Sequence, residues 1–166
     1  MRRKLNYVTP AEALRQVIRI IRPKALDSES AQTSDTFGRV LAEDVIAPMD
    51  LPERDCSRFD GFAVRAKDTY GASSDTPVLL RVKGEIQLGE RVSCELHEEE
   101  TCKVPTGGSL PKGADAVVME EQVVPSGRTS IQICDPLRVG ENVIPRGEDV
   151  KRGERILSKG RILRAQ

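Results

Sequence analysis

The chain has 166 residues, of which 38% are hydrophobic and 31% charged, and its acidic and basic residues balance to a net charge of zero. This composition is typical of a globular protein with a solvated surface, and the zero net charge argues against a protein that binds nucleic acid nonspecifically. Aromatic residues make up only 3% of the chain, too few for stacking on single-stranded nucleic acid, and no apolar run approaches the length that spans a membrane.

A helix is predicted near the N-terminus. Thr9 is a favourable N-cap, Pro10 suits the first helical position, and Glu12 completes a capping box. Apolar residues then recur at helical spacing until Pro23 stops the run, namely Leu14, Val17, Ile18 and Ile21. We expect this apolar stripe to pack against the rest of its domain, and residues 24–38 to form a short helix or a loop.

The middle of the chain is predicted to be mostly β-structure. Aliphatic runs at residues 78–82 and 116–119, and an alternating segment at 130–134, have strand patterns. Residues 125–127 lie between the last two segments and indicate a hairpin connection between them. Small strands separated by turns are expected near the C-terminus, at residues 142–145, 155–157 and 162–163.

Prolines mark both boundaries of this β-rich region, at Pro48 and at Pro136. We expect a discontinuous lobe made of residues 1–48 and 137–166, in which the C-terminal tail rejoins the first segment. Residues 49–136 would be inserted into it as a second, β-rich lobe. The predicted fold class is therefore α+β, rich in β-structure, with an N-terminal helix.

Two turn-rich loops place polar side chains beside glycines, which is where scaffolds commonly hold reactive groups. In the first loop, Asp60 and Gly61 form a common tight-turn pair, and a purely structural role is one interpretation. The functional interpretation is a carboxylate at a loop tip with the hydroxyl of Ser57 near it. Such a group can bind a cation, orient water or act as a base, and one carboxylate does not decide among these roles.

The second loop carries Thr106, Gly107 and Gly108. Two consecutive glycines leave backbone N–H groups approachable, and with the neighbouring hydroxyl they can form a concavity for a phosphate or another oxyanion. No Gly-Lys-Ser/Thr sequence follows, so the loop is not a P-loop. A simple bend after Pro105 is the alternative.

The cysteines do not form a metal-binding pattern. Only one histidine, His97, accompanies the four scattered cysteines, Cys56, Cys94, Cys102 and Cys134. Zinc sites need closely spaced ligands, so none is expected. His97 lies in an acidic stretch, residues 95–100, which we expect to be a solvated loop. Because no apolar leader follows Met1, we expect a cytoplasmic protein with reduced thiols.

Together with a third block at residues 140–149, these loops resemble the N-terminal region of the molybdopterin molybdenumtransferase family, which includes MoeA and the gephyrin E domain. The matching segments are, in chain order, residues 38–45 (GRVLAEDV), 51–52 (LP), 57–66 (SRFDGFAVRA), 106–118 (TGGSLPKGADAVV), 140–143 (GENV) and 147–149 (GED). No single motif suffices, but their order and spacing together are specific. The resemblance spans nearly the whole chain.

The resemblance implies the N-terminal portion of an enzyme that inserts molybdate, or tungstate, into adenylylated molybdopterin in molybdenum cofactor biosynthesis. The family's fold is an N-terminal helix with coiled or bifurcated β-sheets and an inserted β-rich lobe. In the family's homodimer, that lobe faces the pterin-binding domain of the other subunit across the active cleft. This chain ends where the pterin-binding and C-terminal domains should begin, so those domains are expected partners, as is molybdopterin adenylyltransferase.

The resemblance also implies roles for individual residues. It places Asp60 and Thr106 on the cleft wall as catalytic residues, with Asp60 positioning Mg²⁺ or water near the phosphoanhydride. Hydrogen bonding to the substrate is implied for Thr106 and Gly107, and the substrate-binding set is Ser57, Gly61, Gly107 and Gly108.

The chain departs from the family pattern at five positions of these loops, Cys56, Arg58, Phe59, Phe62 and Gly108, and three of these changes bear on the site. Arg58 introduces a cation near the cleft, Phe62 lacks the hydroxyl of the usual tyrosine, and Gly108 replaces the usual alanine, a mild change that loosens the loop. These departures suggest a paralogue with altered metal preference, such as tungstate, or a weakened site. The alternative function is a non-catalytic scaffold or binding module with the same fold; the presence of both Asp60 and Thr106 favours the enzyme.

Overall fold

The computed structural model describes residues 7–22, 24, 26–89 and 94–165. It divides into two compact units, Met1–Ala42 with Gly160–Gln166, and Glu43–Lys159. No helix in these described ranges has the length and apolar character needed to cross a membrane. The predicted lobe boundaries at residues 48 and 137 remain a prediction.

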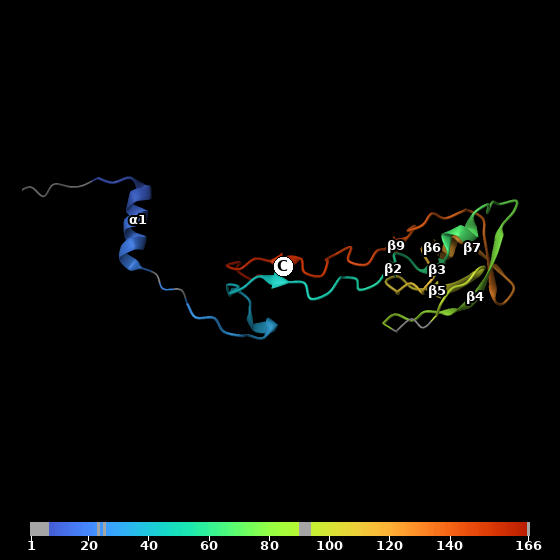
Figure 1. Cartoon of the computed structure of the whole chain (residues 1–166), viewed down its shortest axis with the longest axis horizontal. Helices are drawn as coiled ribbons and strands as arrows, with labels where there is room; N and C mark the ends of the chain where they lie inside the picture. The colour runs from blue at the N-terminus through green and yellow to red at the C-terminus, as the bar shows by residue number, and fades with distance from the viewer. Residues whose placement is uncertain (1–6, 23, 25, 90–93, 166) are drawn as a thin grey trace, which may run out of the picture. The chain divides into compact units, whose positions relative to one another are not determined.

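The first unit contains helix α1, Pro10–Ile21 (Figure 1). The Oγ1 of Thr9 accepts a hydrogen bond from the N–H of Glu12, whose carboxylate accepts one from the N–H of Thr9, so the predicted capping box is confirmed. The cap residue Arg22 is left-handed, with a φ of 44°, and Pro23 lies outside the described residues. No residue of α1 is buried, so the predicted packing of its apolar stripe is not seen among the described residues.

After α1, the polar segment contains a short 3-10 helix, η1 (Thr33–Asp35), which is one of the two forms expected for it. Val40 and Ile162 then form an antiparallel bridge. In this unit the C-terminal tail therefore pairs with the first segment of the chain.

The second unit, which contains the strands labelled β2 to β7 and β9 in Figure 1, is built around a six-stranded sheet with the strand order β6-β3-β5-β4-β8-β7. Adjacent strands are antiparallel except β4 and β5, which are parallel. The strands of this sheet are β3 (Gly61–Val64), β4 (Val78–Glu85), β5 (Glu100–Val104), β6 (Ala116–Met119), β7 (Val123–Ser126) and β8 (Ser130–Ile133). Smaller elements of the unit are the pairs β1 (Val45–Ile46) with β10 (Arg155–Leu157) and β2 (Cys56–Ser57) with β9 (Val143–Ile144), and the 3-10 helices η2 (Ala66–Thr69) and η3 (Glu120–Gln122).

The predicted strands of the middle region are confirmed as β4, β6 and β8, and two of the small C-terminal strands as β9 and β10. The predicted hairpin needs a correction. Pro125 belongs to β7, and the turn at Gly127 joins β7 to β8, whereas β6 pairs with β3. Proline is tolerated in β7 because that strand lies at the edge of the sheet, where one side needs no backbone donor.

The core of this unit lies on both sides of β3, because successive side chains of a strand point to opposite faces. All four residues of β3 are buried. One cluster contains Phe62, Val64, Ala66, Leu80, Ala116, Val118, Ile131, Ile133 and Leu137, and the other contains Ala63, Ile86, Leu96, Cys102, Val104 and Val117. Aliphatic side chains dominate both clusters, in keeping with the low aromatic content of the chain.

Candidate functional site

The three motif-bearing segments meet in the second unit. The N–H of Ser57 donates to the carbonyl of Gly108 at 2.9 Å, and the N–H of Gly107 donates to the carbonyl of Ser57 at 2.8 Å. The third segment is joined by the pairing of β2 with β9 and by the N–H of Arg58, which donates to the carbonyl of Asn142 at 2.9 Å. Main-chain hydrogen bonds therefore hold the two predicted loops and the third block as one locus.

Asp60 and Thr106 are in direct contact at this locus, and both are exposed. The Oδ1 of Asp60 accepts hydrogen bonds from the N–H of Thr106 at 2.7 Å and from its hydroxyl at 3.0 Å. These two bonds, with a smaller contribution from the positive charge of Lys103, hold the pKa of Asp60 below its ordinary value. The carboxylate is therefore ionised at neutral pH and fixed in orientation.

Asp60 can contribute to a magnesium site only together with ligands from elsewhere. Both bonds from Thr106 fall on Oδ1. Across the described ranges, no group of three or more His, Cys, Asp or Glu side chains is placed to hold a metal ion. Since Mg²⁺ in proteins is commonly bound by one or two carboxylates plus substrate phosphates and water, a single exposed carboxylate fits a site shared with a phosphate-bearing substrate.

Ser57 and Gly61 have clear structural roles. Ser57 is fully buried, and its hydroxyl donates to the carbonyl of Phe59 at 2.5 Å, which closes the turn before Asp60. At Gly61 an added Cβ would lie 2.1 Å from the carbonyl oxygen of Val118, so the close approach of β3 and β6 requires glycine there. Binding of substrate by Ser57 and Gly61 remains a prediction.

The N–H groups of Gly107 and Gly108 are not open to a ligand, contrary to expectation. The first donates to Ser57, as above, and the second donates to the carbonyl of Pro105 at 2.8 Å. A Cβ at Gly108 would lie 2.9 Å from atoms of Pro105 and Val104, so the loop in this conformation leaves little room for the usual alanine. The double glycine lets the loop close on itself, and its contact with substrate remains a prediction.

Sequence reasoning missed two ion pairs beside Asp60. Arg58 Nη2 contacts both carboxylate oxygens of Glu148, at 3.1 and 3.2 Å, so the charge that departs from the family pattern is paired with the third block. Lys103 Nζ lies 2.7 Å from a carboxylate oxygen of Glu120, whose N–H donates to the carbonyl of Asp60. For the pair of Lys103 with Glu120, the only indication in the sequence is that Lys103 comes three residues before Thr106 and so lies close to the second loop.

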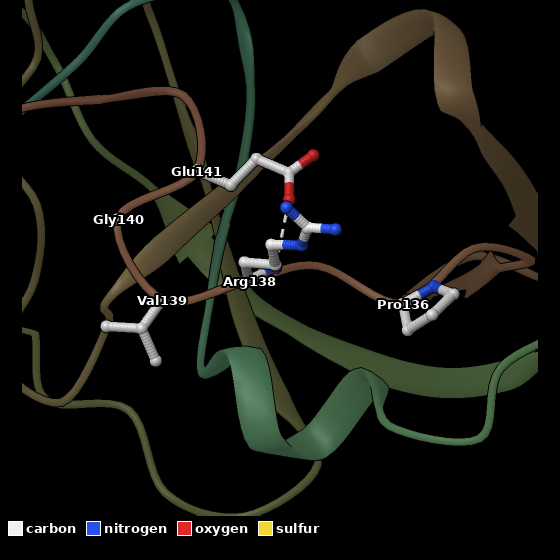
Figure 2. A pocket seen from close by; sticks show the side chains of 5 residues that line it. All are labelled: Pro136, Arg138, Val139, Gly140 and Glu141. Carbon is white, nitrogen blue, oxygen red and sulfur yellow. Dashed lines mark hydrogen bonds between the residues drawn. The ribbon is translucent and has the colours of Figure 1, made fainter.

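A shallow cavity of about 540 Å³ lies on the segment that leads into the third block (Figure 2). It is lined by Pro136, Arg138, Val139, Gly140 and Glu141. The carboxylate of Glu141 accepts a hydrogen bond from the N–H of Arg138 at 2.9 Å, which closes a tight loop immediately before Asn142. The loop thereby fixes the position of Asn142, whose carbonyl accepts the hydrogen bond from the N–H of Arg58.

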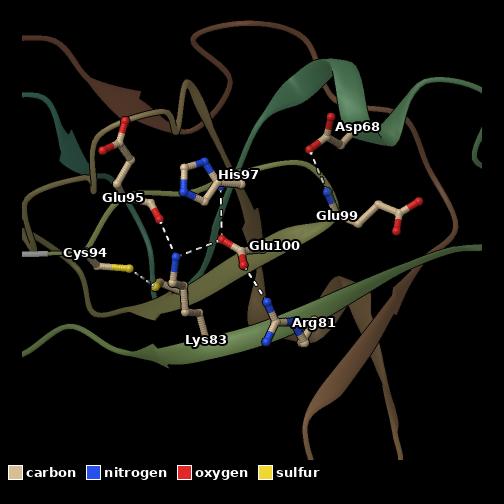
Figure 3. Close-up of polar contacts among 9 residues, drawn as sticks. Asp68, Arg81, Lys83, Cys94, Glu95, His97, Glu99 and Glu100 are labelled. Carbon is tan, nitrogen blue, oxygen red and sulfur yellow. Dashed lines mark hydrogen bonds and ion pairs between the residues drawn. The ribbon is translucent and has the colours of Figure 1, made fainter.

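The acidic stretch at residues 95–100 is only partly the solvated loop that was expected (Figure 3). His97 is exposed, but Glu100 is only 7% exposed and begins β5. Its carboxylate accepts hydrogen bonds from Arg81 Nη2 at 2.5 Å, Lys83 Nζ at 2.9 Å and the N–H of His97 at 3.0 Å. The bond from His97, followed by that from Lys83, lowers the pKa of Glu100 to about 2.

We expect Glu100 to make the fold sensitive to acid. Its pKa is about 2 in the folded chain and 4.5 for an ordinary glutamate, so its stabilising contribution is complete above the higher value and is lost as the pH falls toward the lower one. Thermal unfolding followed by circular dichroism should show a midpoint that falls between about pH 5 and pH 2. The fall should be smaller in Glu100→Gln. The exposed neighbour Glu98 provides the matched control, and an equal fall in Glu98→Gln, Glu100→Gln and the parent would contradict the prediction.

Comparisons with known proteins find relatives over nearly the whole chain. The family model described as MoeA N-terminal region (domain I and II) matches residues 8–166. A molybdopterin molybdenumtransferase of Staphylococcus aureus (strain Mu50 / ATCC 700699) is 31% identical over 160 residues, which are 96% of this chain and 38% of the relative. One from Staphylococcus epidermidis (strain ATCC 12228 / FDA PCI 1200) is 36% identical over 126 residues, 76% of this chain and 30% of the relative.

Two solved structures of the molybdopterin biosynthesis moeA protein from Pyrococcus horikoshii also resemble the chain. One has a TM-score of 0.84 at 34% identity and covers 95% of this chain and 40% of the other. The second has a TM-score of 0.79 at 41% identity, and the match covers 84% of this chain and 37% of the other. The chain therefore spans well under half the length of these relatives, and its β-rich fold with one helix is the fold of their matching part.

Proposed function

This chain belongs to the MoeA family, whose N-terminal region it matches, and we propose that it forms part of an enzyme that inserts molybdate, or tungstate, into adenylylated molybdopterin. The predicted family and fold class are thereby confirmed. The proposal of activity draws on relatives named molybdopterin molybdenumtransferase. Because the chain covers only 38% of the Staphylococcus aureus relative, the remaining domains of that enzyme would have to complete the site.

The observation that carries the proposal is the contact of Asp60 with Thr106. An exposed carboxylate, held ionised and oriented by the N–H and hydroxyl of Thr106, is suited to orient water or to share a cation beside a phosphoanhydride. Mg²⁺ bound there would neutralise charge on the phosphoanhydride oxygens. In this proposal Asp60 orients the reacting group and the hydroxyl of Thr106 fixes the carboxylate, while Ser57, Gly61, Gly107 and Gly108 shape the loops beside the substrate.

We also propose where and with which partners this locus acts. The chain would work in the cytoplasm as part of a homodimer whose cleft is shared between subunits, with the pterin-binding domain supplied by the rest of the enzyme. Molybdopterin adenylyltransferase would deliver the adenylylated substrate.

A second candidate is a non-catalytic scaffold or binding module of the same fold. The observation that favours it is the use of the N–H groups of Thr106, Gly107 and Gly108 within the protein. With these donors occupied, an anionic substrate would have to be held mainly by groups from other domains.

A chimera distinguishes the two candidates. We expect that residues 1–166, grafted in place of the matching region of the Staphylococcus aureus relative, support molybdenum insertion within about a hundredfold of the intact relative, the loss that about 1 Å of misplacement can cause. Molybdenum bound to the product is measured by elemental mass spectrometry after reaction with adenylylated molybdopterin and molybdate, and a tungstate reaction runs in parallel. A chimera that is folded and has the relative's oligomeric state but inserts neither metal would refute the enzyme and leave the scaffold.

A further inference from the structure

Two of the four free cysteines face each other in the second unit. The sulfurs of Cys94 and Cys102 are 3.0 Å apart, and Figure 3 shows the thiol of Cys94 at this contact. A disulfide bond is about 2.05 Å long, so the sulfurs need to approach by only about 1 Å to reach bonding distance. None of the roles proposed for Asp60 and Thr106 uses this pair.

Both cysteines pack against the same core cluster. Cys102 is 1% exposed and lies in the core cluster beneath β5. Cys94 is half-buried and packs against the same cluster. The segment that follows Cys94 is fixed by Lys112, whose carbonyl accepts the N–H of Leu96 at 2.8 Å and whose Nζ lies 2.8 Å from the carboxylate of Glu95. The short separation of the sulfurs is therefore maintained by the core cluster and by the contacts of Lys112 with residues 95 and 96.

A positive charge also stands beside the pair. Lys83 Nζ donates to the carbonyl of Glu95 at 2.8 Å and to Glu100 at 2.9 Å, and the pKa of Lys83 is raised mainly by its hydrogen bond to Glu100, with smaller contributions from Cys94 and Cys102. The thiolate is the reactive form in disulfide exchange.

We propose that Cys94 and Cys102 form a reversible disulfide by exchange with a soluble low-molecular-weight disulfide. The thiolate of Cys94, the more accessible of the two, attacks one sulfur of that compound, breaks its S–S bond, releases one thiolate and leaves a mixed disulfide on Cys94. Cys102 then gives its proton to solvent and attacks the sulfur of Cys94, displacing the second thiolate. Two cysteine thiols lose two electrons in all, and the soluble disulfide is reduced to two thiols.

The second step requires a buried thiol to lose its proton. Burial raises the pKa of Cys102 to about 12, so its thiol is almost entirely protonated at neutral pH. The product closes a ring over residues 94–102 and ties the start of β5 to the segment before it. Since β5 leads directly to Thr106, oxidation would fix the strand that delivers one half of the Asp60–Thr106 contact.

The test is a titration of the full chain with mixtures of reduced and oxidised glutathione. After equilibration, exchange is quenched with acid, free thiols are alkylated in denaturant, and the cysteines are mapped by peptide mass spectrometry. We expect a disulfide joining Cys94 and Cys102 that forms as the mixture becomes more oxidising and is reversed by dithiothreitol. Cys56 and Cys134 should stay alkylated throughout.

Cys102→Ala is the matched control, and it should accumulate glutathione on Cys94 and stop there. In the parent chain, glutathione that stays on Cys94 at equilibrium, or four free thiols in the most oxidising mixture, would each overturn the proposal. So would pairing of Cys94 with Cys56 or Cys134. Because the decisive measurement uses the unmodified sequence, it stands even if the variant fails to fold.

Discussion

A chimera carrying Asp60→Asn is expected to insert molybdenum about a hundredfold more slowly than the parent chimera, or slower still. Asparagine keeps the size of the side chain, and its amide oxygen can still accept the two hydrogen bonds that Thr106 donates to Oδ1. What the substitution removes is the negative charge. The initial rate of molybdenum insertion, measured at saturating molybdate, therefore reports the role of the charge itself.

The matched control for this prediction is Asp44→Asn. The carboxylate of Asp44 accepts a hydrogen bond from the N–H of Lys159 at 2.7 Å, lies 3.3 Å from Arg155, and also has a lowered pKa. It is thus a similar carboxylate in the same unit that has no proposed contact with substrate. Equal rates for the Asp60→Asn and Asp44→Asn chimeras would show that the charge of Asp60 takes no part in the reaction.

Gly61→Ala is expected to produce the largest loss of stability, about 3 kcal/mol or more. Gly61 lies in β3 and pairs with Val104 of β5 on one side and Met119 of β6 on the other. A methyl group there would lie 2.1 Å from the carbonyl oxygen of Val118, which is main chain and has no rotamer to adopt. The two strands would have to separate, which would break hydrogen bonds of the central ladder.

Thermal unfolding of the chain measures this loss, and we expect the midpoint to fall by about 6 to 12 °C. Gly84→Ala is the control, because Gly84 lies in β4 of the same sheet and its added Cβ would meet no atom within 4 Å. That variant should stay within about 1 kcal/mol of the parent. If both variants unfold at the parent's midpoint, the close approach of β3 and β6 does not constrain position 61.

The sequence predicts well those elements whose conformation depends only on residues close to one another along the chain. The capping box of α1 needs only Thr9 and Glu12, three residues apart, and it is present as expected. The strand at Ala116–Met119 likewise follows from a short aliphatic run. The predicted hairpin before β8 is present, but it joins β8 to β7 and not to β6, because Pro125, a residue typical of turns, lies within a strand. An edge position, which tolerates proline, depends on the order of strands in the sheet, and a local pattern does not contain that order.

The candidate site could be predicted only in part. Asp60 and Thr106 follow from the family resemblance, and their contact joins residues 46 positions apart. The pair of Arg58 with Glu148 spans 90 positions, and neither residue has a spacing that indicates the other. Free N–H groups at Gly107 and Gly108 are a reasonable expectation because a glycine pair leaves them accessible. Their actual acceptors, the carbonyls of Ser57 and Pro105, are set by how the loops fold.

The main-chain hydrogen bonds that join the two loops and the third block affect how the sequence of this locus can change among relatives. Main-chain N–H and carbonyl groups link Ser57 with Gly107 and Gly108, and Arg58 with Asn142, and every residue type except proline carries both groups. An exchange at an exposed position such as Arg58 can therefore alter what the locus presents to its surroundings while leaving the backbone in place. Relatives with different preferences for an anion could arise on this frame by changing side chains alone.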